Sequence, residues 1–407
     1  MTLQKTLDLG RTLGVLLAGG QGSRLFELTG AECKPALPFG ETRRIVDFTV
    51  AGAVRSGIRN LLVGTQYCPA TLEAHMTSRW GHAFNSIHMR HGPTVTGTAE
   101  GYAGTAAVLS DNISDIDASG AAEVVVLAGD HVYDMDIAAM IADHRSAGAQ
   151  VTVAVDAVPL SDASSFGVMG TDADGRIRMF VEKPRNPPHM PGDPSRALAS
   201  MGIYVFNWKW LRQVLLADRA NPESSHDFGK DILPHAVAEG VAFAHTRKAD
   251  ADGHAPYWRD VGTLDAFRLS WIDLRDGLAR CRLPETAAPL HRTLTPGQSG
   301  WAGYSIQAGG LSLMPPLGGT RRWTLLDGTV VLPGARIEPG ARLTRAIVAP
   351  GTIIPADLVV GENASEDARW FRVTAGGTTL VTAPMLARRM AAKVTQYRSA
   401  SLITDHV

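Results

Sequence analysis

Short apolar segments alternate with amphipathic ones from residue 13 to about residue 275. Between the apolar runs, Pro69 to Trp80 and Asp136 to Ala147 carry apolar residues at helical spacing. The strand-like runs, rich in Val and Leu, are Val15 to Ala18, Asn60 to Gln66, Glu123 to Gly129 and Val151 to Val158. Apolar strands that alternate with helices predict an α/β domain with a Rossmann-like, mostly parallel sheet covered on both faces.

Two features interrupt this alternation. Phe166 to Met169 and Arg176 to Val181 flank the turn sequence Asp172–Gly175, which predicts a hairpin inserted into the sheet. Ser200 to Phe206 predicts a further strand that begins with a small polar residue and a glycine, and these small residues leave room for a ligand.

The pattern changes after Cys281. Residues 282 to 322 are rich in Gly, Pro and Thr and show no sustained period, which indicates a linker with some irregular strands. Beyond them an aliphatic residue recurs every six positions, with Pro-Gly pairs between, at Val331, Ile337 and Leu343, and after a shift in phase at Ile347, Ile353 and Val359. This period predicts a left-handed parallel β-helix with the aliphatic residues pointing inward, the alternative being a Gly/Pro-rich loop with chance spacing. We therefore expect domains at 1–280 and 323–407, joined by a linker at 281–322.

Composition narrows the function. The 407 residues are 45% hydrophobic with a formal net charge of −1, so a sequence-independent nucleic-acid binder is not expected. No apolar stretch approaches the about 20 residues of a membrane span, and the N-terminus does not have the pattern of a signal peptide. The three cysteines are widely spaced and odd in number, so we expect neither a disulfide framework nor a zinc site, and a cytoplasmic protein.

The most informative motif follows the first strand. After Leu17 and Ala18 comes Gly19-Gly20-Gln21-Gly22-Ser23-Arg24, with Lys34 before Pro35. Glycines after a strand let the backbone approach phosphate oxygens, while Arg24 and Lys34 bring positive charge to the same place. A Gly-Gly pair alone indicates only a tight turn, and neither G-x-x-x-x-G-K-[ST] nor G-x-G-x-x-G is complete. The full string, G-G-x-G-x-R-L followed by K-P-A, favours a triphosphate site.

Two carboxylates are candidates for a metal. Asp130 ends the strand EVVVLAG, where ligands of open parallel sheets bind, and Asp260 lies in YWRDVGT. Together they fit one Mg²⁺ over a triphosphate, although each alone fits a helix cap or a surface acid equally well. His131 and His226 adjoin acids without metal-ligand spacing, so we expect them only to form hydrogen bonds.

A second group of polar residues suits a sugar phosphate. Lys183 in Glu182-Lys183-Pro184 could pair with the phosphate while Glu182 accepts hydrogen bonds from hydroxyl groups, although a Lys before Pro is usually only solvated. Asp227 in SSHDFGKD and Ser200 are further candidates.

The glycine and lysine string resembles the signature of the sugar-1-phosphate nucleotidyltransferases. The blocks TQY (65–67), AGDHVY (128–133), SFGVM (165–169), FVEKP (180–184), ASMGIYVF (199–206), SSHDFGKDILP (224–234), YWRDVGT (257–263) and GENASEDARWF (361–371) are similar to bacterial glucose-1-phosphate adenylyltransferases. The resemblance runs from about residue 12 to 390. It implies ADP-glucose and pyrophosphate production from ATP and glucose 1-phosphate for glycogen synthesis, a need for Mg²⁺, a homotetramer, and a β-helix that serves regulation by anionic effectors and assembly.

The resemblance also implies roles for individual residues. Asp130 and Asp260 are the metal-linked acids and, with Arg24, Lys34 and Lys183, the catalytic residues. The implied ATP contacts are Leu17, Gly19, Gly20, Gly22, Arg24, Lys34, Gln66, Tyr102, Gly104 and Thr105. The implied glucose 1-phosphate contacts are Gly167, Glu182, Lys183, Ser200 and Asp227.

The chain departs from the family pattern at three places. Ala31, Glu32 and Cys33 precede Lys34 where the family is usually basic, residues 101–108 lack the Trp, Arg and Asp of W-Y-R-G-T-A-D-A, and residues 50–58 replace the S-N-C-x-N-S-G-I helix. We therefore expect weak control by sugar phosphates. Three alternatives remain: a non-catalytic, ligand-sensing subunit of the same fold, a nucleotidyltransferase with another base or sugar, and a bifunctional acyltransferase, which the short β-helix segment without an evident catalytic histidine disfavours.

Overall fold

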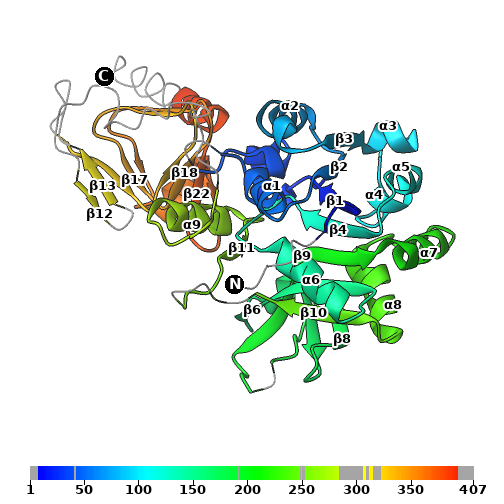
Figure 1. The fold of residues 1–407 in the computed structure, drawn as a ribbon. Helices are drawn as coiled ribbons and strands as arrows, with labels where there is room; N and C mark the ends of the chain where they lie inside the picture. Colours follow the sequence, from blue (N-terminus) through cyan, green and yellow to red (C-terminus); the bar gives the residue numbers. More distant parts are fainter. Residues whose placement is uncertain are drawn as a thin grey trace, which may run out of the picture.

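A mixed sheet forms the centre of the N-terminal domain (Figure 1). The computed structural model describes residues 8–40, 43–190, 192–247, 249, 253–283, 306–308, 311–314 and 322–392. The strands run in the order β10-β6-β9-β4-β1-β2-β3; β3, β2, β1 and β4 are parallel, and β9 is antiparallel to β4 and β6. Their bounds are β1 (Thr12–Leu17), β2 (Asn60–Thr65), β3 (Ser86–His91), β4 (Glu123–Ala128), β6 (Val151–Pro159), β9 (Arg196–Asn207) and β10 (Ala242–Thr246).

Helices cover both faces of this sheet, as predicted. Val15 of β1 joins the apolar cluster under α4, α5, α7 and α8, whereas Leu16 joins the cluster under α1, α2 and α6, because successive strand residues point to opposite faces. The helices are α1 (Val46–Arg55), α2 (Ala70–His75) with the π-helical turn η3 (Met76–Trp80) and the short η4 (Gly81–Ala83), α3 (Gly92–Thr96), α4 (Ala107–Ser110), α5 (Ile113–Ala118), α6 (Ile137–Ser146), α7 (Trp208–Arg219) and α8 (Leu233–Ala238).

The inserted hairpin is present as β7 (Gly167–Thr171) and β8 (Ile177–Glu182), which follow the short helix η5 (Ala163–Ser165). The hairpin pairs with β9 through β7. Strand β9 begins at Arg196, earlier than the strand start predicted at Ser200. Its register against β6 shifts between Val153 and Val155, at the level of Gly202, whose φ is +71°. The shift bends the part of β9 that borders the site.

A small antiparallel sheet brings a later part of the chain back to the end of β4. In it β5 (His131–Tyr133), which directly follows β4, pairs with β11 (Trp258–Asp260). The register places Asp260 opposite His131, so residues far apart in sequence meet at the end of β4. After β11, helix α9 (Leu264–Arg275) leads toward the second domain.

The second domain is a parallel β-helix, in which short strands of successive coils pair side by side. Its strands are β14 (Thr324–Asp327), β15 (Val330–Val331), β16 (Arg336–Ile337), β17 (Arg342–Thr344), β18 (Ala346–Val348), β19 (Ile353–Ile354), β20 (Val359–Val360), β21 (Arg372–Val373) and β22 (Thr379–Val381), with helix α10 (Ala364–Trp370). Strands β12 (Ile306–Ala308) and β13 (Leu311–Met314) add antiparallel to β14. The rest of the predicted linker, residues 284–305, 309–310 and 315–321, and residues 393–407 lie outside the described residues, and the domain limits stay a prediction.

The six-residue period is present, but the predicted phase of its second half is wrong. Ile337 and Leu343 are buried inside the coil as expected, whereas Ile353 is 50% exposed and Val359 is 36% exposed. The inward residues of the second coil are Val348, Ile354 and Val360, which pair with Val331, Ile337 and Leu343. The chain turns at Arg345 with a φ of +49°, and this turn displaces the inward positions by one residue from the predicted series. Ile347 is buried too, but in the cluster that joins the two domains.

Helix α9 joins the domains. Its Phe267 and Trp271 share an apolar cluster with five β-helix residues: Val330, Leu332, Ile347, Ala349 and Leu380. Beside this cluster, the buried Arg268 donates to Thr378 Oγ1 at 2.9 Å and to the Gly328 carbonyl at 3.0 Å. Thr378 in turn donates to Asp265. The domain contact therefore combines apolar burial with satisfied polar groups.

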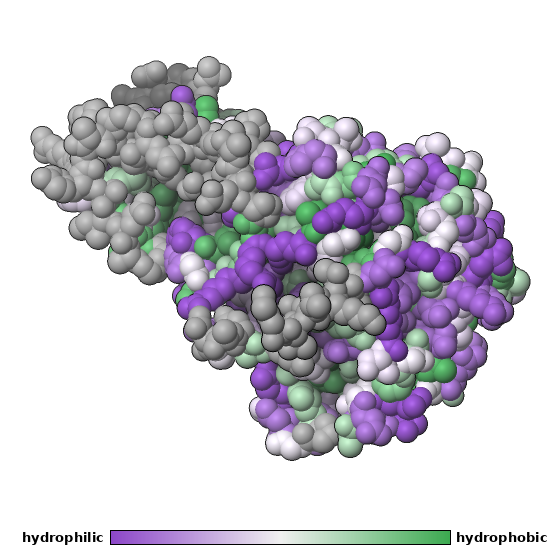
Figure 2. Space-filling view, in the orientation of Figure 1, coloured by the Kyte–Doolittle hydropathy of each residue, from purple (hydrophilic) through white to green (hydrophobic). Residues whose placement is uncertain are grey.

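The face of the N-terminal domain seen in Figure 2 is covered mainly by hydrophilic residues, with hydrophobic ones scattered among them. Within the part of the chain that the structure describes, no helix is both long and apolar enough to cross a membrane.

Candidate functional site

The glycine-rich segment Gly19-Gly20-Gln21-Gly22, called here the glycine loop, follows β1 and leads into the short helix η1 (Ser23–Thr29). Gly22 is the N-cap of this helix and has a φ of +65°. It lies close against Lys34: a Cβ added at Gly22 would be only 3.0 Å from the Lys34 Cβ. A side chain at this position would be strained and would push Lys34 away. The loop and Lys34, which begins the short helix η2 (Lys34–Ala36), are thus built against each other.

Lys34 joins the two predicted metal-linked acids. Its Nζ donates to Asp130 Oδ2 at 3.0 Å and to Asp260 Oδ1 at 2.9 Å, and its side chain is only 4% exposed. Arg24 Nη2 lies 3.7 Å from Asp260 Oδ2, and the Arg24 side chain is largely exposed. Four predicted site residues from four segments therefore meet at the end of β4.

The Lys34 ammonium and the two carboxylates shift one another's pKa values so that all three groups stay ionised. Burial alone would raise the pKa of Asp130, but Lys34 and His131 together hold that pKa below its usual value. Burial likewise acts against the charged form of Asp260, and His131 and Lys34 together keep its pKa low. Burial would lower the pKa of Lys34, but the two carboxylates raise it. The site thus holds two ionised carboxylates around a cation.

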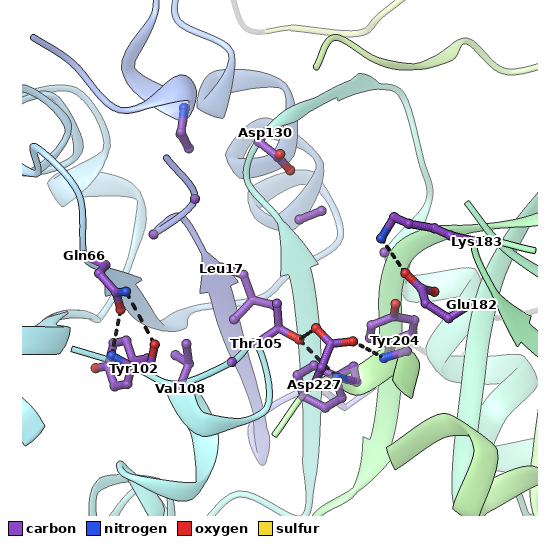
Figure 3. Close-up of a pocket in the computed structure, with 18 residues that line it drawn as sticks. Leu17, Gln66, Tyr102, Thr105, Val108, Asp130, Glu182, Lys183, Tyr204 and Asp227 are labelled. Atoms are coloured by element: carbon purple, nitrogen blue, oxygen red, sulfur yellow. Dashed lines mark hydrogen bonds and ion pairs between the residues drawn. The ribbon is translucent and has the colours of Figure 1, made fainter. Parts of the chain in front are cut away.

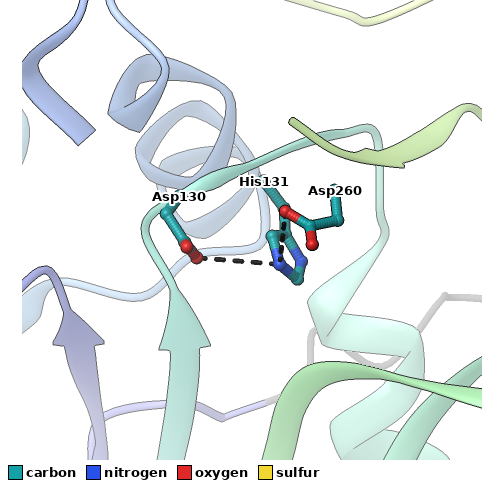
Figure 4. Close-up of side chains that lie close together, drawn as sticks. All are labelled: Asp130, His131 and Asp260. Atoms are coloured by element: carbon teal, nitrogen blue, oxygen red, sulfur yellow. Dashed lines mark ion pairs between the residues drawn. The ribbon is translucent and has the colours of Figure 1, made fainter. Parts of the chain in front are cut away.

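His131 completes a group of three possible ligands. Its Nε2 lies 3.7 Å from Asp130 Oδ1 and 3.6 Å from Asp260 Oδ1. The three side-chain atoms that could bind a metal lie within 4.8 Å of one another (Figure 4). Trp258 Nε1 donates to His131 Nδ1 at 3.4 Å. Because an indole N–H only donates, the neutral ring carries its proton on Nε2, which faces the carboxylates. In this tautomer the protonated Nε2 faces the acids at 3.6–3.7 Å, beyond hydrogen-bond distance, and offers no lone pair to a metal there.

The carboxylate pair fits a divalent cation. A buried ammonium between Asp130 and Asp260 occupies a position where two carboxylate oxygens converge on positive charge, and oxygen ligands are those that Mg²⁺ prefers. The residues that could hold the ion are these two acids.

A pocket of about 450 Å³ opens beside this cluster. In Figure 3, Gln66 and Lys183 lie on opposite sides of the pocket and Asp130 lies between them. The predicted residues that line it are Leu17, Gly19, Gly20, Gln66, Tyr102, Gly104, Thr105, Asp130, Glu182, Lys183 and Asp227. Residues predicted separately for the nucleotide and for the sugar thus border a single cavity.

On the predicted nucleotide side, Gln66 holds the loop before α4. Its Oε1 accepts from the Tyr102 backbone N–H at 2.7 Å, and its Nε2 donates to the Glu100 carbonyl at 2.8 Å. Gly104 is required by close packing, since a Cβ there would lie 2.3 Å from the His226 carbonyl oxygen. The side-chain amide of Gln66 therefore shapes the pocket wall.

Thr105 connects the nucleotide side to the sugar side. Its hydroxyl donates to Asp227 Oδ2 at 2.9 Å, while Asp227 Oδ1 accepts from Gly229 N–H at 2.9 Å and caps the π-helical turn η6 (Phe228–Ile232). Both carboxylate oxygens of Asp227 already have partners within the chain, so this residue also organises the site.

The predicted sugar residues divide into two groups. Glu182 and Lys183 line the pocket and pair with each other, with Lys183 Nζ 2.5 Å from Glu182 Oε1. Lys183 adopts a φ of +46°, an unusual conformation for a residue before proline. Gly167 and Ser200 do not line the pocket: Gly167 packs behind Glu182, and Ser200 is buried and accepts from the Gly202 backbone N–H at 3.2 Å.

Sequence reasoning missed several lining residues: Pro35, Val108, Ala128, Gly202, Tyr204, Phe228 and Gly229. Gly202, Tyr204, Phe228 and Gly229 lie in the motifs ASMGIYVF and SSHDFGKDILP, which also contain the predicted residues Ser200 and Asp227. Their signal was the motif itself. Val108 and Ala128 are ordinary apolar residues and offered none.

Comparison with known sequences agrees with this geometry. The sequence model of the family described as "Nucleotidyl transferase" matches residues 13–273, and that described as "GlmU-like, C-terminal hexapeptide" matches residues 310–381. The hexapeptide match identifies the β-helix as the left-handed type.

Three relatives cover almost the whole chain, and each is named glucose-1-phosphate adenylyltransferase. The protein of Jannaschia sp. (strain CCS1) is 41% identical over 94% of this chain and 98% of its own length. That of Cereibacter sphaeroides (strain ATCC 17029) is 39% identical over 96% and 99%, and that of Yersinia pseudotuberculosis serotype IB (strain PB1/+) is 38% identical over 93% and 95%. The chain belongs to the glucose-1-phosphate adenylyltransferase family of nucleotidyl transferases.

Proposed function

We propose that this protein transfers AMP from ATP to glucose 1-phosphate, giving ADP-glucose and pyrophosphate for glycogen synthesis. The observation that carries the proposal is the cluster of Lys34 and two carboxylates beside a single pocket, in a chain whose relatives bear that enzyme's name. An oxygen of the sugar phosphate attacks the α-phosphorus of ATP and forms a P–O bond. The bond from that phosphorus to the oxygen bridging to the β-phosphate breaks, and pyrophosphate leaves with the electron pair.

This chain's residues would act by positioning and charge. The glycine loop and Arg24 would hold the phosphates of ATP, and Gln66, with the loop that it holds, would lie against the nucleotide. Lys183 would bind the phosphate of glucose 1-phosphate, with Glu182 and the Asp227 segment on the sugar. Because transfer of this kind needs little covalent help, such preorganised groups supply most of the catalysis.

Asp130 and Asp260 would hold Mg²⁺. When bound there, the ion would neutralise charge on the triphosphate. Lys34 now bridges both carboxylates, and we propose that it serves the phosphates when substrate is present.

Two further expectations stay predictions. A homotetramer is proposed from the family resemblance, and the exposed aliphatic residues Ile353 and Val359 on the β-helix offer it an apolar surface. A cytoplasmic location is also proposed, in keeping with three cysteines that are all free thiols.

The proposed reaction is tested directly by pyrophosphate release. Purified protein with Mg²⁺, ATP and glucose 1-phosphate should release pyrophosphate, and omission of either substrate should abolish it. UTP, GTP and dTTP in place of ATP should give much slower release. Faster release with another nucleotide would reassign the base, and no release with any of them would favour a ligand-sensing subunit.

The role of Asp130 is tested by Asp130→Ala. Removing one carboxylate from the cation position should lower turnover on the order of 10²-fold or more, by analogy with the loss of one preorganised electrostatic group. Circular dichroism should show a folded protein, because Asp260 still faces Lys34, while the melting temperature should fall because the buried ammonium loses one of its two carboxylate partners. Asp174→Ala, at the exposed turn of the hairpin, is the matched control and should keep full turnover. A folded Asp130→Ala protein with normal turnover would remove Asp130 from the mechanism.

The role of Lys183 is tested by comparing two Michaelis constants. Lys183→Ala should raise KM for glucose 1-phosphate far more than KM for ATP, because a phosphate loses its ammonium partner. Lys209→Ala, an exposed lysine on α7, should change neither constant. Equal effects on both substrates would show that Lys183 does not bind the sugar phosphate.

Weak activation by sugar phosphates is the expectation for regulation. A phosphorylated activator needs free Arg or Lys donors, but Glu32 stands near Lys34 and accepts from Arg44 Nη1 at 3.3 Å. We propose that this pair leaves less free positive charge for an anion. Titration with fructose 1,6-bisphosphate, fructose 6-phosphate and pyruvate at subsaturating ATP should leave activity little changed. Activation of about tenfold or more by any of them would contradict the expectation.

A further inference from the structure

A strained residue lies within the predicted phosphate-binding segment, which consists of the glycine loop and η1 (Ser23–Thr29). Phe26 of η1 has φ +52° and ψ −124°, a conformation that non-glycine residues rarely adopt. It lies two residues after Arg24, and its side chain is 43% exposed rather than buried. Such strain persists only where the surroundings hold it, and it concentrates at functional sites.

The outer side of this strained segment is held by the β-helix. Arg372 of β21 donates through Nε to Glu27 Oε2 at 2.8 Å and through Nη2 to Glu27 Oε1 at 2.5 Å, which makes a two-pronged ion pair. The Arg372 guanidinium also lies over the Phe26 ring, with Cζ 4.1 Å from its centroid. This contact joins residues 345 positions apart in sequence.

The inner side of the segment is held by the cluster that joins the domains. Leu25 and Leu28 are buried there together with the β-helix residues Val330 and Leu332. Thr29 Oγ1 lies 3.1 Å from both the Gly22 and the Phe26 carbonyl oxygens, so it ties the start of η1 to the strained residue. The β-helix therefore contacts η1 directly through Arg372 and shares with it the apolar cluster that joins the domains.

The electrostatics support a specific pair at this contact. The hydrogen bonds from Arg372 lower the pKa of Glu27, and Glu27 raises that of Arg372. The pair is only partly exposed, with 38% of the Arg372 side chain and 37% of the Glu27 side chain accessible.

We propose that Arg372 is a positioning residue for ATP: through Glu27 and Phe26 it holds η1 in the conformation that presents Arg24 and the Gly22 turn to the triphosphate. The inference rests on the proposed function. It adds that the β-helix domain contributes to nucleotide binding within a single chain, through a contact with the phosphate-binding segment itself.

The chain offers a matched control for this ion pair. Arg342 binds Glu362 with Nε 2.8 Å and Nη2 2.7 Å from the same Glu362 oxygen, at comparable exposure. Both residues of that pair belong to the β-helix domain. Arg342→Ala therefore removes a similar surface ion pair without touching η1.

The experiment measures ATP binding by equilibrium dialysis with Mg²⁺, and KM for both substrates by pyrophosphate release. Arg372→Ala should raise the dissociation constant and KM for ATP about two- to fivefold, as expected for the loss of one partly exposed ion pair, with KM for glucose 1-phosphate unchanged. Glu27→Ala should do the same, and the double variant should be no worse than either single one. Arg372→Lys should lie between wild type and Arg372→Ala, because lysine keeps the charge but not the two-pronged geometry.

The outcomes separate this inference from the proposed function. Wild-type protein that binds no ATP would overturn both. Wild-type binding with an Arg372→Ala protein that binds equally well, or no worse than Arg342→Ala, would overturn the positioning role alone. An equal rise in KM for both substrates would also overturn it, because a general loss of structure and not the phosphate segment would then be responsible.

Discussion

The site is organised around the buried ammonium of Lys34. A cation that is 4% exposed is stable only if carboxylates face it, and here Asp130 and Asp260 both do so within 3.0 Å. The carboxylates come from different parts of the fold. Asp130 lies at the carboxyl end of the central strand β4, and Asp260 lies beside it because β11 pairs with β5. This requirement for charge compensation ties the start of η2, the end of β4 and the end of β11 into one unit.

Much of the fold follows from local pattern. Strands β1, β2, β4, β6 and β9 and the hairpin could be predicted because each is a short apolar or alternating run bounded by turns, whereas the outer strands β3 and β10 were missed. The phase of the β-helix could not, because its inward positions depend on how the chain turns at Arg345, and neighbouring aliphatics such as Ile353 and Ile354 look equivalent in sequence. A period is a property of the sequence, whereas a side chain's direction within it depends on backbone turns.

The candidate site shows the same division. Residues with distinctive chemistry, such as Lys34, Asp130 and Lys183, could be chosen from motifs, and the structure brings them to one region. The sequence predicts Ser200 as a site residue from its place at a strand start, but the strand begins earlier and its register shifts at Gly202. Tyr204 therefore lines the pocket while Ser200 lies buried behind it. Such an exchange follows from pairing between strands, which no local pattern reports.

A comparison of approximate free energies shows what holds the phosphate-binding segment in place. The conformation of Phe26 costs roughly 1–3 kcal/mol. A partly exposed ion pair such as Arg372–Glu27 contributes about 0.2–1 kcal/mol and does not offset that strain alone. Burial of Leu25 and Leu28, at roughly 1.5–3 kcal/mol for each side chain, does offset it. The apolar cluster shared with the β-helix therefore stabilises the strained segment, and Arg372 selects the orientation of its outer face. The attachment of a β-helix to this catalytic domain is then part of how the phosphate-binding segment keeps its shape.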